Sequence, residues 1–364
     1  MTWIASADHE TARFSPNGLG VDRHMTPQVD VTENATLARG TLMLETRMSP
    51  NVKPQFLFGY DRVFPWNRAF SIQAIPGGGI TLVHSNHGDV CHATLRWHGT
   101  GRADVVRIIF SWDAPSGWAQ LSLERPEEST AASIQVNFPK PFYIEDLRDA
   151  ILGKGDRTFS NDAVFIALSD EIEPVGPMPT LTLDTPIATP WGHKLARNLE
   201  RGDTVTTQKS GTVPILQRVT RTVPALGSFA PIRLRAPYFG LSQDVIAAPD
   251  QRLVIRGSDV EYLFGQEAVL VPARHLVNGF AARYEPSGST ITYTHLLLPG
   301  HETLSVAGSS FESLYIGRIR RKPDQLDASS LSMFERNSLP EHGKPVFPIL
   351  KAYEAITLAD QRAA

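Results

Sequence analysis

The chain has 364 residues, of which 41% are hydrophobic and 20% are charged, and its formal net charge is −3. This length predicts two domains, or at most three, and the interspersed charge excludes the strongly basic surface that is typical of a nucleic-acid-binding domain. No run of the sequence approaches the ~18 apolar residues of a membrane-spanning helix.

Short runs of strand-forming residues, separated by glycine and proline, follow one another through the first half of the chain. Residues 1–36 are polar and irregular and predict at most an edge strand. Strands are predicted at 41–47, 70–75, 80–84, 93–98, 105–112, 118–124, 133–138 and 163–168. Their spacing of mostly about 8 to 14 residues is typical of a β-sandwich, which we expect over residues 1–169.

Residues 107–124 read as a strand, a turn and a second strand. Together with residues 97–98 they resemble the laminin-G/concanavalin type of jelly roll, which implies a lectin-like domain. Sugars stack on exposed aromatic rings, and Trp66, Trp112 and Trp118 are the candidates for this contact. The alternative is that these tryptophans belong to the core of the sandwich. The paired-carboxylate strand of the related glucanases does not occur, so glycosidase activity on that template is not expected.

Five residues of the two types that most often bind zinc fall close together, namely His84, His87, Cys91, His92 and His98. Their spacing does not match the usual two-plus-two zinc patterns, and the adjacent Cys91 and His92 would point to opposite faces of a strand. We therefore predict no metal site, and interpret the cluster as exposed hairpin residues with a free thiol.

An acidic, proline-rich segment, residues 170–179, follows the first domain. Prolines remove backbone donors and stiffen the chain, so we predict a linker here. A second domain is expected over residues 180–320 and a C-terminal extension over 321–364. Within the extension, short helices are predicted around residues 326–337 and 350–362.

The second domain opens with two patterns, Thr-x-Ile-x-Thr and Leu-x-x-Gly-Asp-x-Val. The matching residues are Thr185, Ile187, Thr189, Leu199, Gly202, Asp203 and Val205. Further segments continue the match in the same order, at 230–236, 263–265, 269–279 and 293–298. Residues 180–320 therefore resemble the bacterial form of the Hint domain, the hedgehog/intein fold.

The resemblance implies a specific chemistry, in which a Cys side chain attacks the preceding peptide carbonyl with help from a His in a Thr/Ser-x-x-His block. It places Thr180 at the Cys position, Gln251 at the His position and Ala248 at the hydroxyl position of the block. A hydroxyl is a weaker nucleophile than a thiol and needs a base, which Gln251 cannot supply. His295 lies in a matching block, and is either a general acid or a structural, hydrogen-bonded histidine, whereas His275 is expected to be structural.

These observations predict an all-β protein, in which a jelly-roll-like sandwich precedes a Hint-type fold with short helices in the C-terminal extension. The leading hypothesis is a binding or assembly protein that is not an enzyme, needs no cofactor and recognises a glycan or a protein surface. One alternative is a self-cleaving protein that uses Thr180, with His295 as general acid. The other is a carbohydrate-binding module that carries a Hint passenger.

No nucleic acid or membrane is expected among the partners, and the sequence predicts no oligomeric state. The N-terminus lacks the basic and apolar segments of a secretory signal. The single cysteine, Cys91, excludes an intramolecular disulfide framework. We therefore expect a cytoplasmic location by default, with signal-free export as the alternative.

Overall fold

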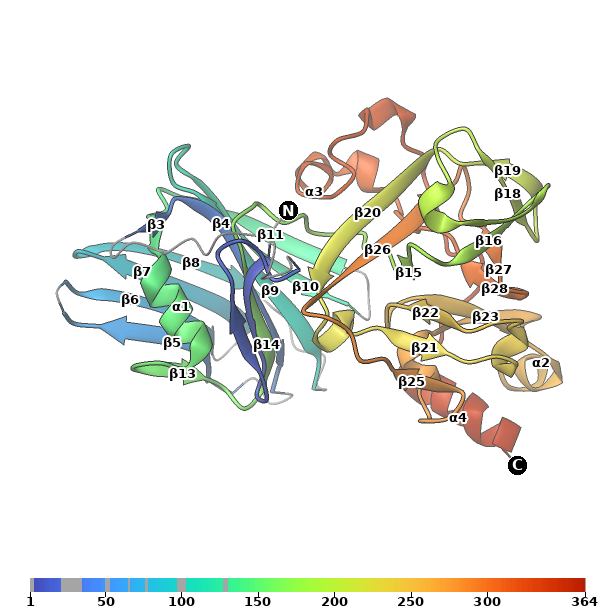
Figure 1. Ribbon diagram of the computed structural model, residues 1–364, viewed down its shortest axis with the longest axis horizontal. Coiled ribbons are helices and arrows are strands. Elements are labelled where there is room, and N and C mark those ends of the chain that lie inside the picture. Colours follow the sequence, from blue (N-terminus) through green and yellow to red (C-terminus); the bar gives the residue numbers. More distant parts are fainter. Residues whose placement is uncertain are drawn as a thin grey trace. The chain divides into compact units, whose positions relative to one another are not determined.

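The computed structural model describes residues 3–20, 35–49, 53–64, 66–75, 78–96, 103–126 and 130–363. The chain divides into two compact units, Met1–Gly176 and Pro177–Ala364. Strands in several antiparallel sheets make up most of the regular structure of both units, and the helices are few and short (Figure 1). The prediction of an all-β protein is thereby confirmed.

The first unit is built on two antiparallel sheets. Its strands are β1 (Trp3–Ala7), β2 (Ala12–Phe14), β3 (Thr36–Leu37), β4 (Arg39–Arg47), β5 (Gln55–Arg62), β6 (Arg68–Ile75), β7 (Gly79–Asn86), β8 (Asp89–Arg96), β9 (Val105–Asp113), β10 (Trp118–Arg125), β11 (Thr130–Asn137), β12 (Phe142–Tyr143), β13 (Arg157–Phe159) and β14 (Ala163–Ser169). Among the described residues, the larger sheet has the order β11-β10-β9-β4-β14-β1-β2 and the smaller the order β13-β5-β6-β7-β8. The short strands β3 and β12 pair with each other.

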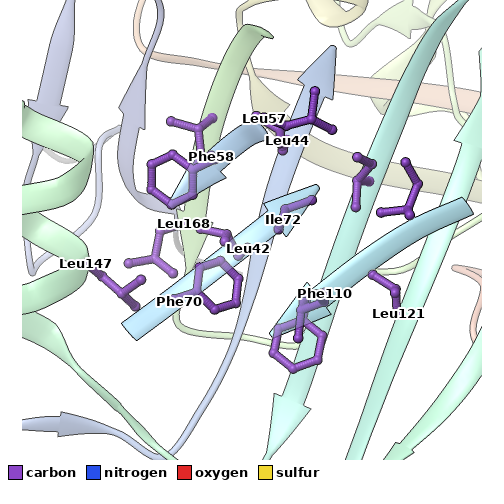
Figure 2. Close-up of a cluster of buried hydrophobic side chains, with 14 of the residues drawn as sticks. Leu42, Leu44, Leu57, Phe58, Phe70, Ile72, Phe110, Leu121, Leu147 and Leu168 are labelled. Atoms are coloured by element: carbon purple, nitrogen blue, oxygen red, sulfur yellow. The ribbon is translucent and has the colours of Figure 1, made fainter. Parts of the chain in front are cut away.

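One hydrophobic core lies between these two sheets, which makes the first unit a sandwich (Figure 2). The side chains that meet there include Leu42, Leu44 and Phe110 from the larger sheet and Phe58, Phe70 and Ile72 from the smaller. The helix α1 (Ile144–Leu152) adds Leu147 to the same core. In β6, buried and partly exposed residues alternate along the strand, as expected for a sheet with one face on the core.

Several elements of the first unit differ from the sequence-based expectation, among them β1, β5 and α1. Strand β1 is no edge strand, because it lies between β14 and β2 and all five of its residues are buried. Strand β5 was not predicted, although Leu57 and Phe58 are fully buried in the core. The helix α1 was also missed, and it ends at Gly153, whose φ of 77° is a conformation that glycine adopts without strain.

The second unit also contains two antiparallel sheets around a core. Its strands are β15 (Leu181–Thr182), β16 (Pro186–Thr189), β17 (Gly192–Leu195), β18 (Thr204–Thr207), β19 (Gly211–Pro214), β20 (Gln217–Pro224), β21 (Ile232–Leu234), β22 (Val245–Ala247), β23 (Arg252–Arg256), β24 (Ala268–Pro272), β25 (Ala282–Tyr284), β26 (Thr290–Leu297), β27 (Thr303–Val306) and β28 (Ser309–Glu312). One sheet has the order β20-β26-β15-β22-β21-β25, and the other contains β17-β16-β27-β28-β23-β24 with β18 and β19 attached.

Short helices connect these strands and fill the end of the chain. The α-helices are α2 (Ser258–Phe264), α3 (Pro323–Asp327) and α4 (Ala352–Ala363). The 3-10 helices are η1 (Ala196–Asn198), η2 (Gly227–Phe229), η3 (Tyr238–Gly240), η4 (Ala273–Leu276), η5 (Ile319–Arg321) and η6 (Arg336–Ser338). No helix in the described part of the chain has the length and apolar character needed to cross a membrane.

The C-terminal residues 321–364, which we call the tail, pack onto the second unit. Leu326, Leu331 and Leu339 join a buried cluster with Leu297 of β26. His342 Nε2 lies 3.1 Å from the carbonyl oxygen of Leu298. The tail is therefore a part of the unit's packed interior, and not only an extension beyond the predicted boundary at residue 320.

Candidate functional site

Thr180 immediately precedes the short central strand β15, and that position fixes where its side chain lies. Leu181 pairs on one side with Ala247 of β22 and on the other with Thr294 of β26. The carbonyl oxygen of Thr180 accepts a hydrogen bond of 2.8 Å from the backbone N–H of Ala248. The segment is thus held on both flanks, in the middle of the six-stranded sheet.

The three residues that the sequence singled out lie together. The Thr180 hydroxyl donates to Gln251 Oε1 at 2.6 Å, and Thr180 Oγ1 also lies 3.1 Å from His295 Nδ1. The exposed fractions of Thr180, Gln251 and His295 are 5%, 0% and 2%, so the group is closed to bulk water. We refer to these residues as the Thr180 triad.

The orientation of Gln251 follows from its second polar atom. Gln251 Nε2 donates to the carbonyl oxygen of Arg252 at 3.0 Å and approaches that of Glu312 at 3.5 Å. Since carbonyl oxygens only accept, the amide nitrogen faces them and the amide oxygen faces Thr180. The backbone of Gln251 is also fixed, because its N–H bonds to Ala248 and its carbonyl accepts from Ala273.

The protonation of His295 follows from its contacts and its burial. Its Nε2 lies 2.9 Å from the carbonyl oxygen of Glu312, so this nitrogen carries a hydrogen. Burial lowers the pKa of His295 to about 4, which outweighs the opposing effect of its bond to Glu312. At neutral pH the ring is therefore uncharged, and its Nδ1 presents a lone pair to the Thr180 hydroxyl.

Glu312 joins the triad to a buried ion-pair group. Its Oε2 lies 3.1 Å from Arg252 Nη1 and 3.3 Å from His301 Nε2. His301 Nδ1 accepts from the backbone N–H of Val346 in the tail at 2.9 Å. Glu312 therefore contributes its carbonyl oxygen to the triad and its carboxylate to the contacts with Arg252 and His301.

The segment before Thr180 is covered from two directions. The sulfur of Met178 accepts from Arg221 Nη1 at 3.7 Å, and Arg221 is buried. The Ser330 hydroxyl of the tail donates to the carbonyl oxygen of Pro177 at 3.5 Å. The peptide bond between Pro179 and Thr180 thus lies in an ordered, packed environment.

This arrangement brings a hydroxyl nucleophile close to a nitrogen base, which is one requirement for attack on a neighbouring carbonyl. However, the base is weak because burial lowers its pKa, and the hydroxyl makes its shorter hydrogen bond to an amide oxygen. An amide oxygen takes up no proton at neutral pH. The geometry therefore favours a stable hydrogen-bonded group over an activated nucleophile.

The three tryptophans proposed as sugar platforms differ in exposure. Trp112 is fully buried, and its indole N–H donates to the carbonyl oxygen of Leu37 at 3.0 Å, so it belongs to the core and offers no face to a ligand. Trp118 is partly buried in β10. Trp66 is 61% exposed in the loop between β5 and β6. Only Trp66 of the three retains a largely accessible ring.

The members of the predicted histidine and cysteine cluster face in different directions. His84 is buried and stacks on Phe142, with 4.0 Å between ring centroids, and Cys91 is also buried. This corrects the expectation that both residues are exposed. His87 and His92 are exposed, and His98 lies outside the described residues. Within the described ranges no group of three or more such side chains is placed to hold a metal ion.

Glu312 is the residue of this site that the sequence did not indicate. Its contact with His295 and Gln251 is made by the backbone carbonyl, which every residue type carries. The pairing of β27 with β28 brings that carbonyl to the triad. Residue identity alone could not have revealed it.

Comparison with known families identifies the second unit. A family model described as the Hint domain matches residues 179–318. The search of curated proteins found no similar sequence.

Several solved structures are similar to the chain. One is the bacterial intein-like domain from Clostridium thermocellum, with 12% identity, a TM-score of 0.28, and coverage of 37% of this chain and 99% of that one. Another is the MchDnaB-1 intein, with 11% identity, a TM-score of 0.25, and coverage of 37% and 98%. A third is SCP-B, a member of the Eqolisin family of peptidases, with 7% identity, a TM-score of 0.18, and coverage of 58% and 92%.

Proposed function

Because residues 179–318 form a Hint domain, we propose that this domain serves as a non-processing scaffold in a binding or assembly protein. The observation that carries the proposal is the hydrogen bond between Thr180 and Gln251. The side chain that would attack is engaged, at 2.6 Å, by an amide that cannot remove its proton. Thr180 and Gln251, two of the residues that differ from the family pattern, thus satisfy each other's hydrogen-bonding needs.

The surroundings support the same function. Nucleophilic attack by a hydroxyl needs a base of adequate strength, and the only imidazole in contact with Thr180 in the described structure has a pKa lowered to about 4. The site is also closed to the water that would hydrolyse an ester, since all three side chains are buried. A domain that lacks an activating base and access to water can still serve as a stable, folded scaffold.

A second candidate function rests on one distance, the 3.1 Å between Thr180 Oγ1 and His295 Nδ1. In a self-cleaving reaction, Thr180 Oγ1 would bond to the carbonyl carbon of Pro179 and lose its proton to His295. The Pro179–Thr180 C–N bond would break, and His295 would return the proton to the freed amine. The product would be an ester that hydroxylamine cleaves into two chains.

Intact mass spectrometry of the purified protein distinguishes the two functions. After prolonged incubation at neutral pH, with and without hydroxylamine, we expect a single species at the mass of the full chain. The Thr180→Ala variant is the matched control, because it lacks the hydroxyl. Fragments 1–179 and 180–364 that form in the wild type and not in Thr180→Ala would establish self-cleavage and overturn the scaffold function.

A further inference from the structure

The turn between β7 and β8 carries an unusual side chain. His87 has a φ of 55° and Gly88 a φ of 89°, so two consecutive residues have positive φ, as in the type I′ turn of a tight hairpin. Asn, Asp and Gly are the usual residues at the first of these positions. A histidine there is held in a strained conformation, and such strain is concentrated at functional positions.

The His87 ring is part of a stack of aromatic rings. Its centroid lies 5.7 Å from that of Trp66, with 26° between the planes, and 6.2 Å from that of Tyr143, with 19° between the planes. His87 Nε2 is also 3.1 Å from the Tyr143 hydroxyl. We call Trp66, His87 and Tyr143 the aromatic stack.

The inner end of the stack is fixed to buried structure. The guanidinium of Arg68 lies 4.2 Å from the centre of the Tyr143 ring, and Arg68 forms a buried ion pair with Asp146 at 2.9 Å. The backbone N–H of His87 donates to the carbonyl oxygen of Asn67, which ties the turn to the loop that carries Trp66. The stack is therefore held in place before any ligand arrives, which reduces the entropy lost on binding.

The outer end of the stack is accessible and has polar neighbours. Trp66 stacks on His87 on one side and is 61% exposed. Asp89, beside the turn, forms an exposed ion pair of 2.7 Å with Lys140, and the hydrogen bond from Lys140 lowers the pKa of the Asp89 carboxyl. The turn that places His87 against Trp66 is thus followed directly by an exposed acidic group with a basic partner.

We propose that the aromatic stack is a carbohydrate-binding site for a neutral oligosaccharide. One face of a pyranose ring carries C–H groups that pack on an aromatic ring, while its hydroxyls require donors and acceptors beside that ring. Trp66 supplies the ring, and Asp89, Lys140 and His87 supply the hydrogen-bonding groups. Because Asp89 and Lys140 neutralise each other, the site favours an uncharged sugar over an acidic one.

A protein surface is the competing occupant, since Val63 and Phe64 in the same loop are exposed by 75% and 85%. The paired charges and the flat ring favour the sugar. This proposal concerns the first unit alone and does not depend on whether the Hint domain is inactive. Its failure would leave the scaffold function untouched, and self-cleavage would leave the sugar site untouched.

The proposal is tested by isothermal titration calorimetry of the full chain with cellopentaose, laminaripentaose and mannopentaose, and with an acidic galacturonate pentamer. We expect at least one neutral pentamer to bind and to quench tryptophan fluorescence, with the acidic pentamer binding more weakly. Trp66→Ala should weaken the binding of the neutral pentamer at least tenfold. Trp191→Ala, which removes a tryptophan of the second unit that is even more exposed than Trp66, should leave binding unchanged.

A second variant separates the ring of His87 from the shape of the turn. Glycine suits the positive φ, so His87→Gly should leave the thermal unfolding midpoint of the first unit unchanged. It should nevertheless weaken the binding of the neutral pentamer severalfold. Three results would overturn the proposal: no neutral pentamer binds, Trp66→Ala binds as the wild type does, or the acidic pentamer alone binds. Loss of self-association in Trp66→Ala, measured by analytical ultracentrifugation without any sugar binding, would identify a protein contact instead.

Discussion

The hydroxyl of Thr180 has a single hydrogen and two acceptors within reach, Gln251 Oε1 and His295 Nδ1. The Gln251 bond is the shorter, so the hydrogen lies there while the neutral imidazole faces the hydroxyl oxygen. A protonated imidazole would satisfy every contact, but burial opposes it. The single hydroxyl hydrogen therefore goes to Gln251, and the lone pair of His295 Nδ1 receives no hydrogen from Thr180.

Replacing Thr180 with valine removes that donor and almost preserves the shape of the side chain. Gln251 Oε1 would then be buried without a partner, so we expect Thr180→Val to lower the free energy of unfolding of the second unit by about 1–3 kcal/mol. Urea unfolding at pH 7 measures the change. Thr212→Val, at an exposed position of β19, is the control and should differ from the wild type by less than about 0.5 kcal/mol. An unchanged Thr180→Val protein would contradict this assignment.

If the chemistry was lost at these two positions, restoring both should return it. In Thr180→Cys/Gln251→His, a thiol and an imidazole occupy the positions that the Hint pattern assigns to them, and a thiol is the stronger nucleophile. We expect hydroxylamine to release fragments 1–179 and 180–364 from the double variant, seen as two masses. Each single variant should stay intact, because it lacks one of the two groups. An intact double variant would contradict the prediction and point to a further obstacle, such as Pro179.

The family pattern carries position as well as residue type, and the three residues that it singled out lie together in the structure. Gln251 and His295 lie 71 and 115 residues after Thr180 along the chain, yet both side chains contact that of Thr180. What the sequence could not supply was the Glu312 carbonyl and the direction of the Thr180 hydrogen bond. Both depend on the register of strands, and no residue type signals them.

At the level of elements, most strands of the sandwich were predicted because aromatic and β-branched residues alternate with polar ones between clear turns. Strand β1 was underestimated because Trp3–Ala7 contains small and polar residues that are buried only by neighbours on both sides. The helix α1 was missed for a related reason. It has only nine residues, and its stability comes from packing Leu147 and Ile151 on the core.

The tail packs into the second unit, although the sequence pattern predicted it to be an extension beyond the domain of residues 180–320. His342 Nδ1 accepts from the N–H of Ile316 at 3.3 Å, while its Nε2 reaches Leu298. Ile349 forms a parallel bridge with Leu270, so the tail also pairs with β24. The tail residues that make these contacts come after the matched Hint region, residues 179–318. The contacts therefore make the stability of that region depend on the tail.

Leu331 tests this dependence. Its side chain is fully buried in the cluster with Leu326 and Leu297, so Leu331→Ala should cost about 2–5 kcal/mol through lost burial and the cavity left behind. Urea unfolding, followed by a probe in the second unit, gives the value. Met333→Ala is the matched control, since Met333 is 77% exposed, and should change stability by less than about 0.5 kcal/mol. Equal effects of the two variants would show that the tail is only loosely attached.

On the scale of the whole molecule, each unit has its own core and its own histidines whose pKa is lowered by burial. His84 lies in the sandwich, and His275, His295 and His342 lie in the second unit. Burial is the main cause that lowers the pKa of each of them to about 4. The two units should therefore respond differently to acid.

The sign of this response follows from proton binding. Between pH 6.5 and 4 the unfolded chain binds protons at these histidines and the folded chain does not, so stability is constant above about pH 6.5 and falls as the pH drops toward 4. Each group contributes a slope of at most about 1.4 kcal/mol per pH unit. In the sandwich, Asp146 acts in the opposite direction, because burial raises its pKa and the folded state then binds the extra proton.

We therefore expect the second unit to lose stability more steeply than the sandwich between pH 6.5 and 4.5. Hydrogen exchange read by mass spectrometry on the full chain follows both units in one experiment, after correction for the intrinsic pH dependence of exchange. His84→Phe removes the titrating ring from the sandwich and should flatten the response of that unit alone, because Phe142 can stack on the new ring as it does on His84. A sandwich that is the more acid-sensitive unit, or a second unit that gains stability as the pH falls, would show that these histidines are not the groups that control the acid response.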